Sequence, residues 1–173
     1  MPTPISRARH GAPEQRAFAD YLAGPSTVAV ASLADIEMFL RSCTYVLSPT
    51  RDPDWTMLAS HFEMQRCGNC LDHSLWAWRK LRELGQPAEL VVGVVDPNQE
   101  PLMRHAWVVF QQDEQRVRLE TIVKAAELPM VQHVRPQADA YWPEIGVSRD
   151  GLPFGYTGMM RFSDVPAGPP WQV

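Results

Sequence analysis

The chain is poor in cysteine, in long apolar runs and in clustered basic residues. Its three cysteines cannot all pair with one another, and three in 173 residues do not fit the disulfide framework of small secreted domains. No apolar run approaches the ~20 residues that cross a membrane, and the N-terminus lacks the apolar stretch of a signal peptide. We therefore expect a reducing, cytoplasmic setting without a membrane partner, in which thiols stay reduced.

The charge balance argues against a further class of partner. The net charge is −4 at pH 7, and the 21% of residues that are charged include no run of Lys or Arg. Surfaces that bind nucleic acid usually carry clustered Lys and Arg side chains, so we expect no nucleic acid as partner. The hydrophobic share of 45% is enough for a core, and 173 residues suit one domain.

Periodicity divides the chain into a loose N-terminal arm, residues 1–12, and one domain, residues 13–173. Helices are predicted over 13–22, from Ser32 to just before Ser48, and over 55–64, with Cys43 on the buried face of the second. The last fifty residues hold seven prolines and are predicted to form an ordered but irregular wrap, because they also contain aromatic residues: Tyr141, Trp142, Phe154 and Tyr156.

The best-specified helix begins at Cys70. Asn69 is a good N-cap, Asp72 can bond back to the cap from the third helical position, and Gly85 suits the C-terminal stop. The buried stripe of this helix comprises Leu71, Ser74, Leu75, Trp78 and Leu81, and its outer side comprises Arg79, Lys80, Arg82 and Glu83. Strands are predicted to follow over 90–95, 105–110 and 117–123, which indicates an α+β fold.

The position of Cys70 suits a nucleophile. Only the thiolate form of a cysteine attacks well, and a thiol is mostly protonated at neutral pH. Unpaired backbone N–H groups at the head of a helix stabilise a thiolate and can hold the oxyanion of a tetrahedral intermediate. Gly68 would let the backbone approach a substrate closely, and an imidazole beside the sulfur would take its proton. The candidate for that imidazole is His105.

The parity of a hairpin places His105 and Glu120 on one face of the sheet. A four-residue loop over 111–114 would set them directly opposite each other, and a two-residue turn at 113–114 would make them diagonal neighbours. Only a loop with an odd number of residues would place His105 and Glu120 on opposite faces of the sheet. Directly opposed residues have Cβ atoms ~5 Å apart, so the carboxylate can orient the imidazole as in a catalytic triad.

The order and spacing of these residues resemble the transglutaminase-like superfamily over about residues 55–123. Its bacterial cysteine-peptidase members typically show Gly-Asp-Cys-x-Asp, then His-Ala, then Leu-Asp. The resemblance implies a papain/transglutaminase-like core, with the nucleophile helix packed on an antiparallel sheet. It also implies Cys70 as nucleophile, His105 as base and Glu120 as the orienting acid. The matching segments here are Gly68-Asn69-Cys70-Leu71-Asp72, His105-Ala106-Trp107-Val108 and Leu119-Glu120.

Two positions depart from that pattern, because Asn69 and Glu120 stand where these peptidases usually have Asp. The chain is also similar to leader peptidases of lasso-peptide biosynthesis, although its segment after Lys124 does not match them. The chain is also faintly similar to arylamine N-acetyltransferases, but it is too short to contain their extra domain.

Three other interpretations remain open. Cys67 and Cys70 have the spacing of a dithiol redox motif, but the segment before them is polar and broken, unlike the strand before a thioredoxin-like site. Cys67, Cys70 and His73 with His61 could bind zinc, although no second, distant ligand pair is evident. A fold that carries a triad can also be a catalytically inactive binding module.

The leading hypothesis is an enzyme that works through an acyl-enzyme on Cys70. With water as acceptor it hydrolyses an amide bond in a peptide or protein; with an amine as acceptor it is a transglutaminase or another acyltransferase. The chemistry requires no metal and no other cofactor, and the sequence does not determine the oligomeric state.

Overall fold

The computed structural model describes residue 18 and the ranges 20–47, 57–96, 98, 103–134, 140–157 and 160–162. The predicted N-terminal arm, residues 1–12, lies outside these ranges, as do residues 55–56 of the predicted third helix. Within the described ranges, no helix combines the length and the apolar composition that crossing a bilayer requires.

The first long helix is shorter than predicted. Helix α2 spans Leu33–Ser42, and the Ser32 side chain accepts a hydrogen bond from the backbone of the first turn. It ends at Ser42 because the next residues are extended and pair with another segment: β1 (Thr44–Tyr45) lies parallel to β2 (Cys67–Gly68). Cys43 is buried in the core, as predicted, and helix α3 spans Ala59–Gln65.

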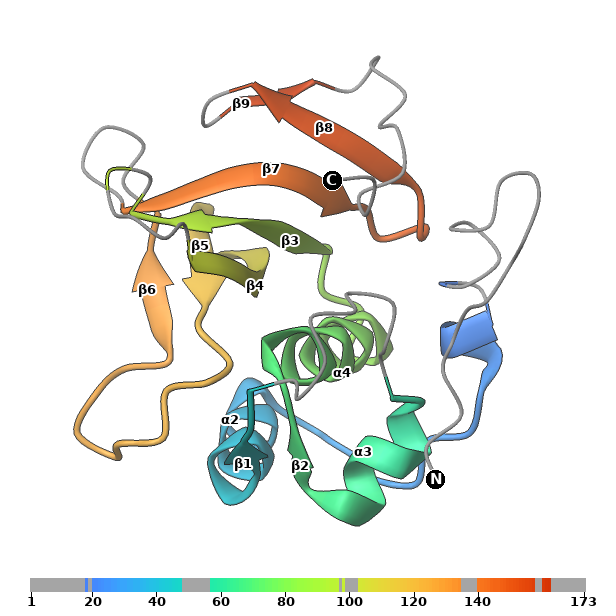
Figure 1. Cartoon of the computed structure of the whole chain (residues 1–173). Coiled ribbons are helices and arrows are strands. Elements are labelled where there is room, and N and C mark those ends of the chain that lie inside the picture. The colour runs from blue at the N-terminus through green and yellow to red at the C-terminus, as the bar shows by residue number, and fades with distance from the viewer. Residues whose placement is uncertain are drawn as a thin grey trace.

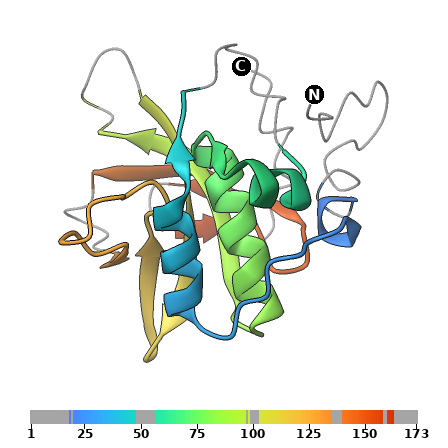
Figure 2. The ribbon, with the colours of Figure 1, turned by 90° about the horizontal axis from the view of Figure 1, so that it is seen from below.

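Helix α4 spans Cys70–Glu83, as the capping pattern predicts. It is buried on more sides than a surface helix, because the sheet covers one side and α2 and α3 cover another (Figures 1 and 2). Of the residues expected on its outer side, Arg79 and Lys80 are therefore buried. Their charges are paired: Arg79 with Glu83, and Lys80 with Glu83 at 2.9 Å and with the buried Glu63 at 3.5 Å.

One seven-stranded antiparallel sheet packs on α4, in the order β6-β5-β4-β3-β7-β8-β9 (Figure 1). This confirms the predicted α+β fold with the Cys70 helix on an antiparallel sheet. The strands are β3 (Ala88–Val95), β4 (Met103–Gln112), β5 (Gln115–Leu119), β6 (Val131–His133), β7 (Tyr141–Val147), β8 (Pro153–Thr157) and β9 (Met160–Phe162).

Two predictions about the sheet were wrong. The third predicted strand, 117–123, ends at Leu119, because the chain turns at residues 121–122. The region expected to be an irregular wrap supplies β7, β8 and β9 within its described part, because its backbone pairs outward from β3. Its prolines are tolerated: Pro153 is the first residue of β8, and Pro143 lies beside the irregularity described next.

A β-bulge in β7 changes which way its side chains point. The register between β3 and β7 shifts between Val92 and Gly93. Val147, beyond the shift, packs in the core with α4, whereas Tyr141 packs with Trp107 on the opposite face of the sheet. Residues six apart in a regular strand share one face, so the bulge is what separates these two side chains.

Gly93 is required where the bulge crosses β3. A Cβ at this position would lie 2.1 Å from the carbonyl oxygen of Trp142 and 2.9 Å from the ring of Trp107. No side chain tolerates the first of these distances, and the obstructing atom is backbone. The bulge in β7 can therefore approach β3 this closely only because residue 93 has no side chain.

We predict that Gly93→Ala lowers the free energy of unfolding by about 3 kcal/mol or more, because the new methyl group forces two strands apart. Gly155→Ala is the matched control: it also lies in a strand of this sheet, and a Cβ there meets nothing within 4 Å. Urea unfolding of both variants measures the difference. Equal midpoints for the two variants would contradict the described packing of β3 on β7.

Candidate active site

Cys70 is the first residue of α4 and is half-buried. The Asn69 side chain accepts hydrogen bonds from the backbone N–H groups of Leu71 and Asp72, at 2.9 and 3.0 Å. The Asp72 carboxylate accepts in return from the backbone N–H of Asn69 at 3.0 Å, which completes a capping box. The head of the helix that carries the candidate nucleophile is therefore rigidly defined.

The absence of a side chain at Gly68 makes room for the capping carboxylate. A Cβ at this position would lie 2.7 Å from the Cβ of Asp72. Asp72 is 4% exposed, and burial raises the pKa of its carboxyl group, although hydrogen bonds from the backbone of Met57 and Asn69 oppose that shift. Asp72 is a structural cap, as expected from its position in the helix.

His105 and Glu120 form a buried pair. Their side chains are 8% and 4% exposed, and the imidazole Nε2 lies 2.9 Å from each carboxylate oxygen. The hairpin has the two-residue turn of the second predicted alternative, with positive φ at both Asp113 and Glu114. The two side chains are thus diagonal neighbours, with Glu120 directly after the end of β5.

The charges in this pair stabilise each other. Burial would lower the pKa of the His105 imidazole, but interactions with the Cys70 side chain and the Glu120 carboxylate raise it from 6.5 to about 9. Burial would raise the pKa of the Glu120 carboxyl group, but His105, Tyr141 and the backbone of Ile122 hold it below its usual value. At neutral pH the pair is an imidazolium beside a carboxylate.

Cys70 and Glu120 interact with the same imidazole. Both carboxylate oxygens face the same ring nitrogen of His105, Nε2. The structure therefore brings all three predicted site residues together: one from the head of α4, one from β4 and one from the end of β5.

Ser74 connects α4 to both strands of the hairpin. It lies one turn after the candidate nucleophile, and its hydroxyl donates a hydrogen bond to the carbonyl oxygen of Ala106, next to His105, at 2.9 Å. The same hydroxyl lies 2.9 Å from that of Thr121, the residue after the candidate acid. Because Ser74 has one hydrogen to donate, Thr121 is the donor to Ser74. These two bonds fix the distance between the helix head and the hairpin.

Tyr141 is a site residue that the sequence did not reveal. Its hydroxyl donates a hydrogen bond of 2.6 Å to Glu120 Oε2. The sequence placed Tyr141 in an irregular segment, and no local pattern announces that a bulge will direct it toward the hairpin. Tyr141 is the first residue of β7, and the pairing of this strand with β3 brings it to the site. The sequence did not predict that pairing.

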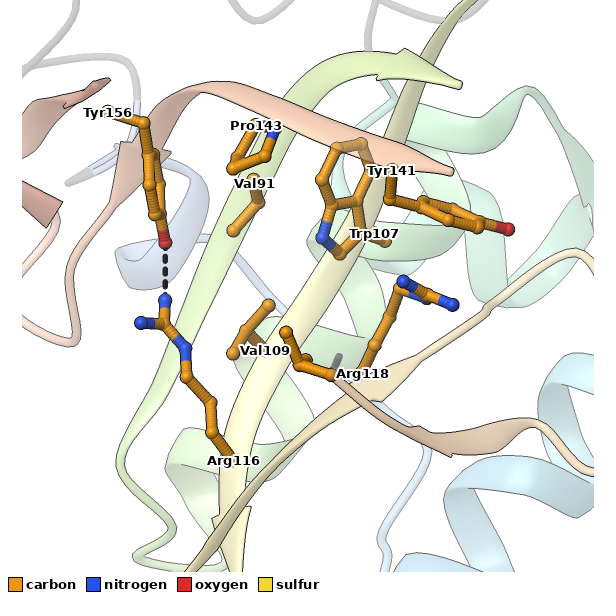
Figure 3. A pocket seen from close by; sticks show the side chains of 9 residues that line it. Val91, Trp107, Val109, Arg116, Arg118, Tyr141, Pro143 and Tyr156 are labelled. Carbon is orange, nitrogen blue, oxygen red and sulfur yellow. Dashed lines mark hydrogen bonds between the residues drawn. The ribbon is translucent and has the colours of Figure 1, made fainter. Parts of the chain in front are cut away.

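A hollow lies on the face of the sheet opposite α4, against the rings of Trp107 and Tyr141 (Figure 3). These two rings lie 6.1 and 6.0 Å from the His105 ring. The walls of the hollow include Trp107 and Tyr141, with Arg116, Arg118 and Tyr156 around them. Its volume is about 20 Å³, enough for a water molecule and too small for a substrate side chain.

The alternative zinc site receives little support. In the described part of the chain no three His, Cys, Asp or Glu side chains converge on a possible metal position. His73, considered as a zinc ligand, is fully buried, with its Nδ1 2.8 Å from the carbonyl oxygen of Asn69. Burial lowers the pKa of His73 to about 4, so this imidazole is a neutral core residue that donates to the helix cap.

We predict that NMR titration of His105 gives a midpoint near pH 9. Glu120→Gln should move the midpoint down toward 6.5, because burial lowers the His105 pKa and the carboxylate that counteracts this effect is then absent. The charge on His105 stabilises the fold fully below pH 6.5, and this contribution is lost as the pH rises through 9. Glu144→Gln, which removes a surface carboxylate paired with Arg104, is the control and should leave the midpoint unchanged. A wild-type midpoint near 6.5 would contradict the described pair.

The chain is similar to one family model and to two solved structures. Residues 51–128 match the family model described as the transglutaminase-like superfamily. LapG of Legionella pneumophila superposes with a TM-score of 0.52 at 14% identity, over 80% of this chain and 77% of LapG. A candidate cysteine protease of Cytophaga hutchinsonii gives a TM-score of 0.42 at 13% identity, over 88% of this chain and 55% of that one. No curated protein matches the chain by sequence.

At this level of identity the likeness to LapG shows the fold alone, which is the predicted papain/transglutaminase-like α+β fold. The family match covers the whole segment from before α3 to beyond β5, and so includes Cys70, His105 and Glu120. Through this central segment, the chain is similar to the transglutaminase-like superfamily.

Proposed function

We propose that the chain is a cysteine-nucleophile acyl-transfer enzyme that hydrolyses an amide bond in a peptide or protein. The observation that carries the proposal is the His105 imidazole, which interacts with Cys70 on one side and with the buried Glu120 carboxylate on the other. Nucleophile, base and orienting group within reach of one another form the arrangement that acyl-transfer chemistry requires.

In the resting site of this proposal, the proton of the Cys70 thiol already lies on His105, which leaves a thiolate beside an imidazolium. In the first step, the thiolate sulfur attacks the carbonyl carbon of the substrate. The C–S bond forms while the carbonyl π bond becomes an oxyanion. The N–H groups of Leu71 and Asp72 are bonded to the Asn69 side chain, which leaves that of Cys70 as the first-turn donor for the oxyanion. The raised pKa of His105 supports a proton resting on the imidazole.

In the second step, the imidazolium of His105 gives its proton to the leaving amine as the C–N bond breaks, and the acyl group remains on Cys70. Water then attacks the thioester, its proton passes to the imidazole, and the sulfur leaves to regenerate the enzyme. Glu120 stays ionised throughout and holds the imidazole by Nε2, and we assign proton exchange with the sulfur and the leaving group to Nδ1. The carboxylate is suited to this role because its own pKa is held low.

We predict that p-nitrophenyl acetate acylates Cys70 in the wild type, with a burst of p-nitrophenolate equal to the enzyme concentration. An activated ester tests the machinery without knowledge of the natural substrate. Cys70→Ala should abolish the burst, and His105→Ala should slow acylation by roughly 10²–10⁴-fold, because proton transfer by a positioned base contributes about that much. Stopped-flow absorbance measures the burst, and mass spectrometry locates the acetyl group.

Cys67→Ala is the matched control, because Cys67 is a half-buried free thiol three positions away. The acyl-transfer proposal predicts a full burst in this variant, whereas a dithiol redox function requires both cysteines. Added methylamine distinguishes the acceptors: unchanged turnover means hydrolysis, and faster turnover with N-methylacetamide as product means transfer to amines. No acylation of Cys70 in the wild type would refute the proposed function.

A further inference from the structure

We propose that Tyr141 is a positioning residue for Glu120, and that its hydroxyl is what allows a glutamate to act as the orienting acid at this site. The inference rests on the proposed function and deepens it. Glutamate has one more rotatable bond than the aspartate that its bacterial peptidase relatives usually carry here, so its carboxylate needs an additional restraint to stay on the imidazole.

The carboxylate of Glu120 is held at both oxygens. Oε2 accepts the 2.6 Å hydrogen bond from the Tyr141 hydroxyl, and Oε1 accepts a weaker one of 3.3 Å from the backbone N–H of Ile122. Both oxygens also face Nε2 of His105 at 2.9 Å. A carboxylate with a donor on each side cannot rotate without breaking one of them. Tyr141 supplies the shorter of these two restraints.

Tyr141 is itself held in place by its ring. The Arg118 guanidinium carbon lies 3.4 Å from the ring centroid, and the Trp107 ring meets it edge to face at 5.2 Å. Figure 3 shows the ring beside Trp107 and Arg118, with the hydroxyl directed away from Tyr156. A cation over a phenol ring also strengthens the hydroxyl as a donor, because it stabilises negative charge on the oxygen.

The β-bulge supplies the geometry. Without the register shift at Gly93, Tyr141 would point toward α4, on the same face as Val147. With it, the Tyr141 ring lies 6.0 Å from the His105 ring, on the face where the hairpin carries the pair. Bulges that redirect one side chain are common next to active sites. Here the redirected side chain is the one that bonds to the orienting acid.

The first test compares Tyr141→Phe with Tyr156→Phe in the p-nitrophenyl acetate reaction. Tyr156 is the matched control, because it lies in the same sheet and its hydroxyl bonds to another glutamate, Glu89, at 3.0 Å. Tyr141→Phe keeps the ring and removes only the hydroxyl, so we expect kcat to fall about 10-fold while KM changes less than about 2-fold. Tyr156→Phe should match the wild type. Equal kcat values for the two variants would overturn the inference.

A double-mutant cycle separates positioning from a general structural role. Glu120→Asp withdraws the carboxylate from Tyr141 by about one C–C bond, ~1.5 Å. If the hydroxyl acts through the length of Glu120, adding Tyr141→Phe to the Glu120→Asp variant should cost no further activity. If the hydroxyl only supports the fold, Tyr141→Phe should cause the same 10-fold loss with either acid at this position, and the inference fails.

A readout independent of activity keeps the two proposals distinguishable. The NMR titration midpoint of His105 should fall in Tyr141→Phe, because the carboxylate spends less time on Nε2, and should stay unchanged in Tyr156→Phe. If the wild type is not acylated but the midpoint falls only in Tyr141→Phe, the proposed function fails and the positioning role stands. If acylation occurs and the midpoint is the same in all three proteins, the positioning role fails and the function stands.

Discussion

The buried contact between His105 and Glu120 is the interaction on which the site depends. Each side chain is too buried to be charged alone, and the opposite charge and shared hydrogen bonds are what make burial tolerable. When the carboxylate holds Nε2, the direction of the other ring nitrogen, Nδ1, is fixed as well. The reactivity proposed for Cys70 therefore depends on a pair of residues from a different part of the chain.

Two local features hold the head of α4, which carries the Cys70 sulfur, near the His105 imidazole. The capping box of Asn69 and Asp72 fixes where α4 begins, and Ser74 bonds to the strand and to the turn that carry the pair. A helix head alone offers N–H groups to any anion. Here it is held against the hairpin at a defined distance, so that the sulfur and the imidazole share one site.

The sequence predicted the parts of the site that depend on short-range patterns. The helix from Cys70 follows from its cap and stripe, and the common face of His105 and Glu120 follows from hairpin parity, whichever even loop forms. The turn itself was left open because Asp113 and Glu114 adopt positive φ without glycine or asparagine, the residues that usually signal such a turn.

The remaining features of the fold and the site depend on strand pairing between distant segments, which no local sequence pattern predicts. The helix that begins after Ser32 ends early because the residues after it pair with β2, and the proline-rich region becomes β7 to β9 because its backbone extends the sheet. The role of Tyr141 follows from a one-residue bulge opposite Gly93. A glycine inside a strand indicates a close approach of backbone, but not which strand approaches.

The most direct test of the central claim is the rate of Cys70 alkylation by limiting iodoacetamide as a function of pH, with and without the His105→Ala substitution. The account predicts that wild-type Cys70 reacts rapidly well below pH 8, ahead of Cys43 and Cys67, and that the variant loses this advantage. Equal, slow labelling of all three cysteines, rising only near the ordinary thiol pKa of ~8.5, would contradict it.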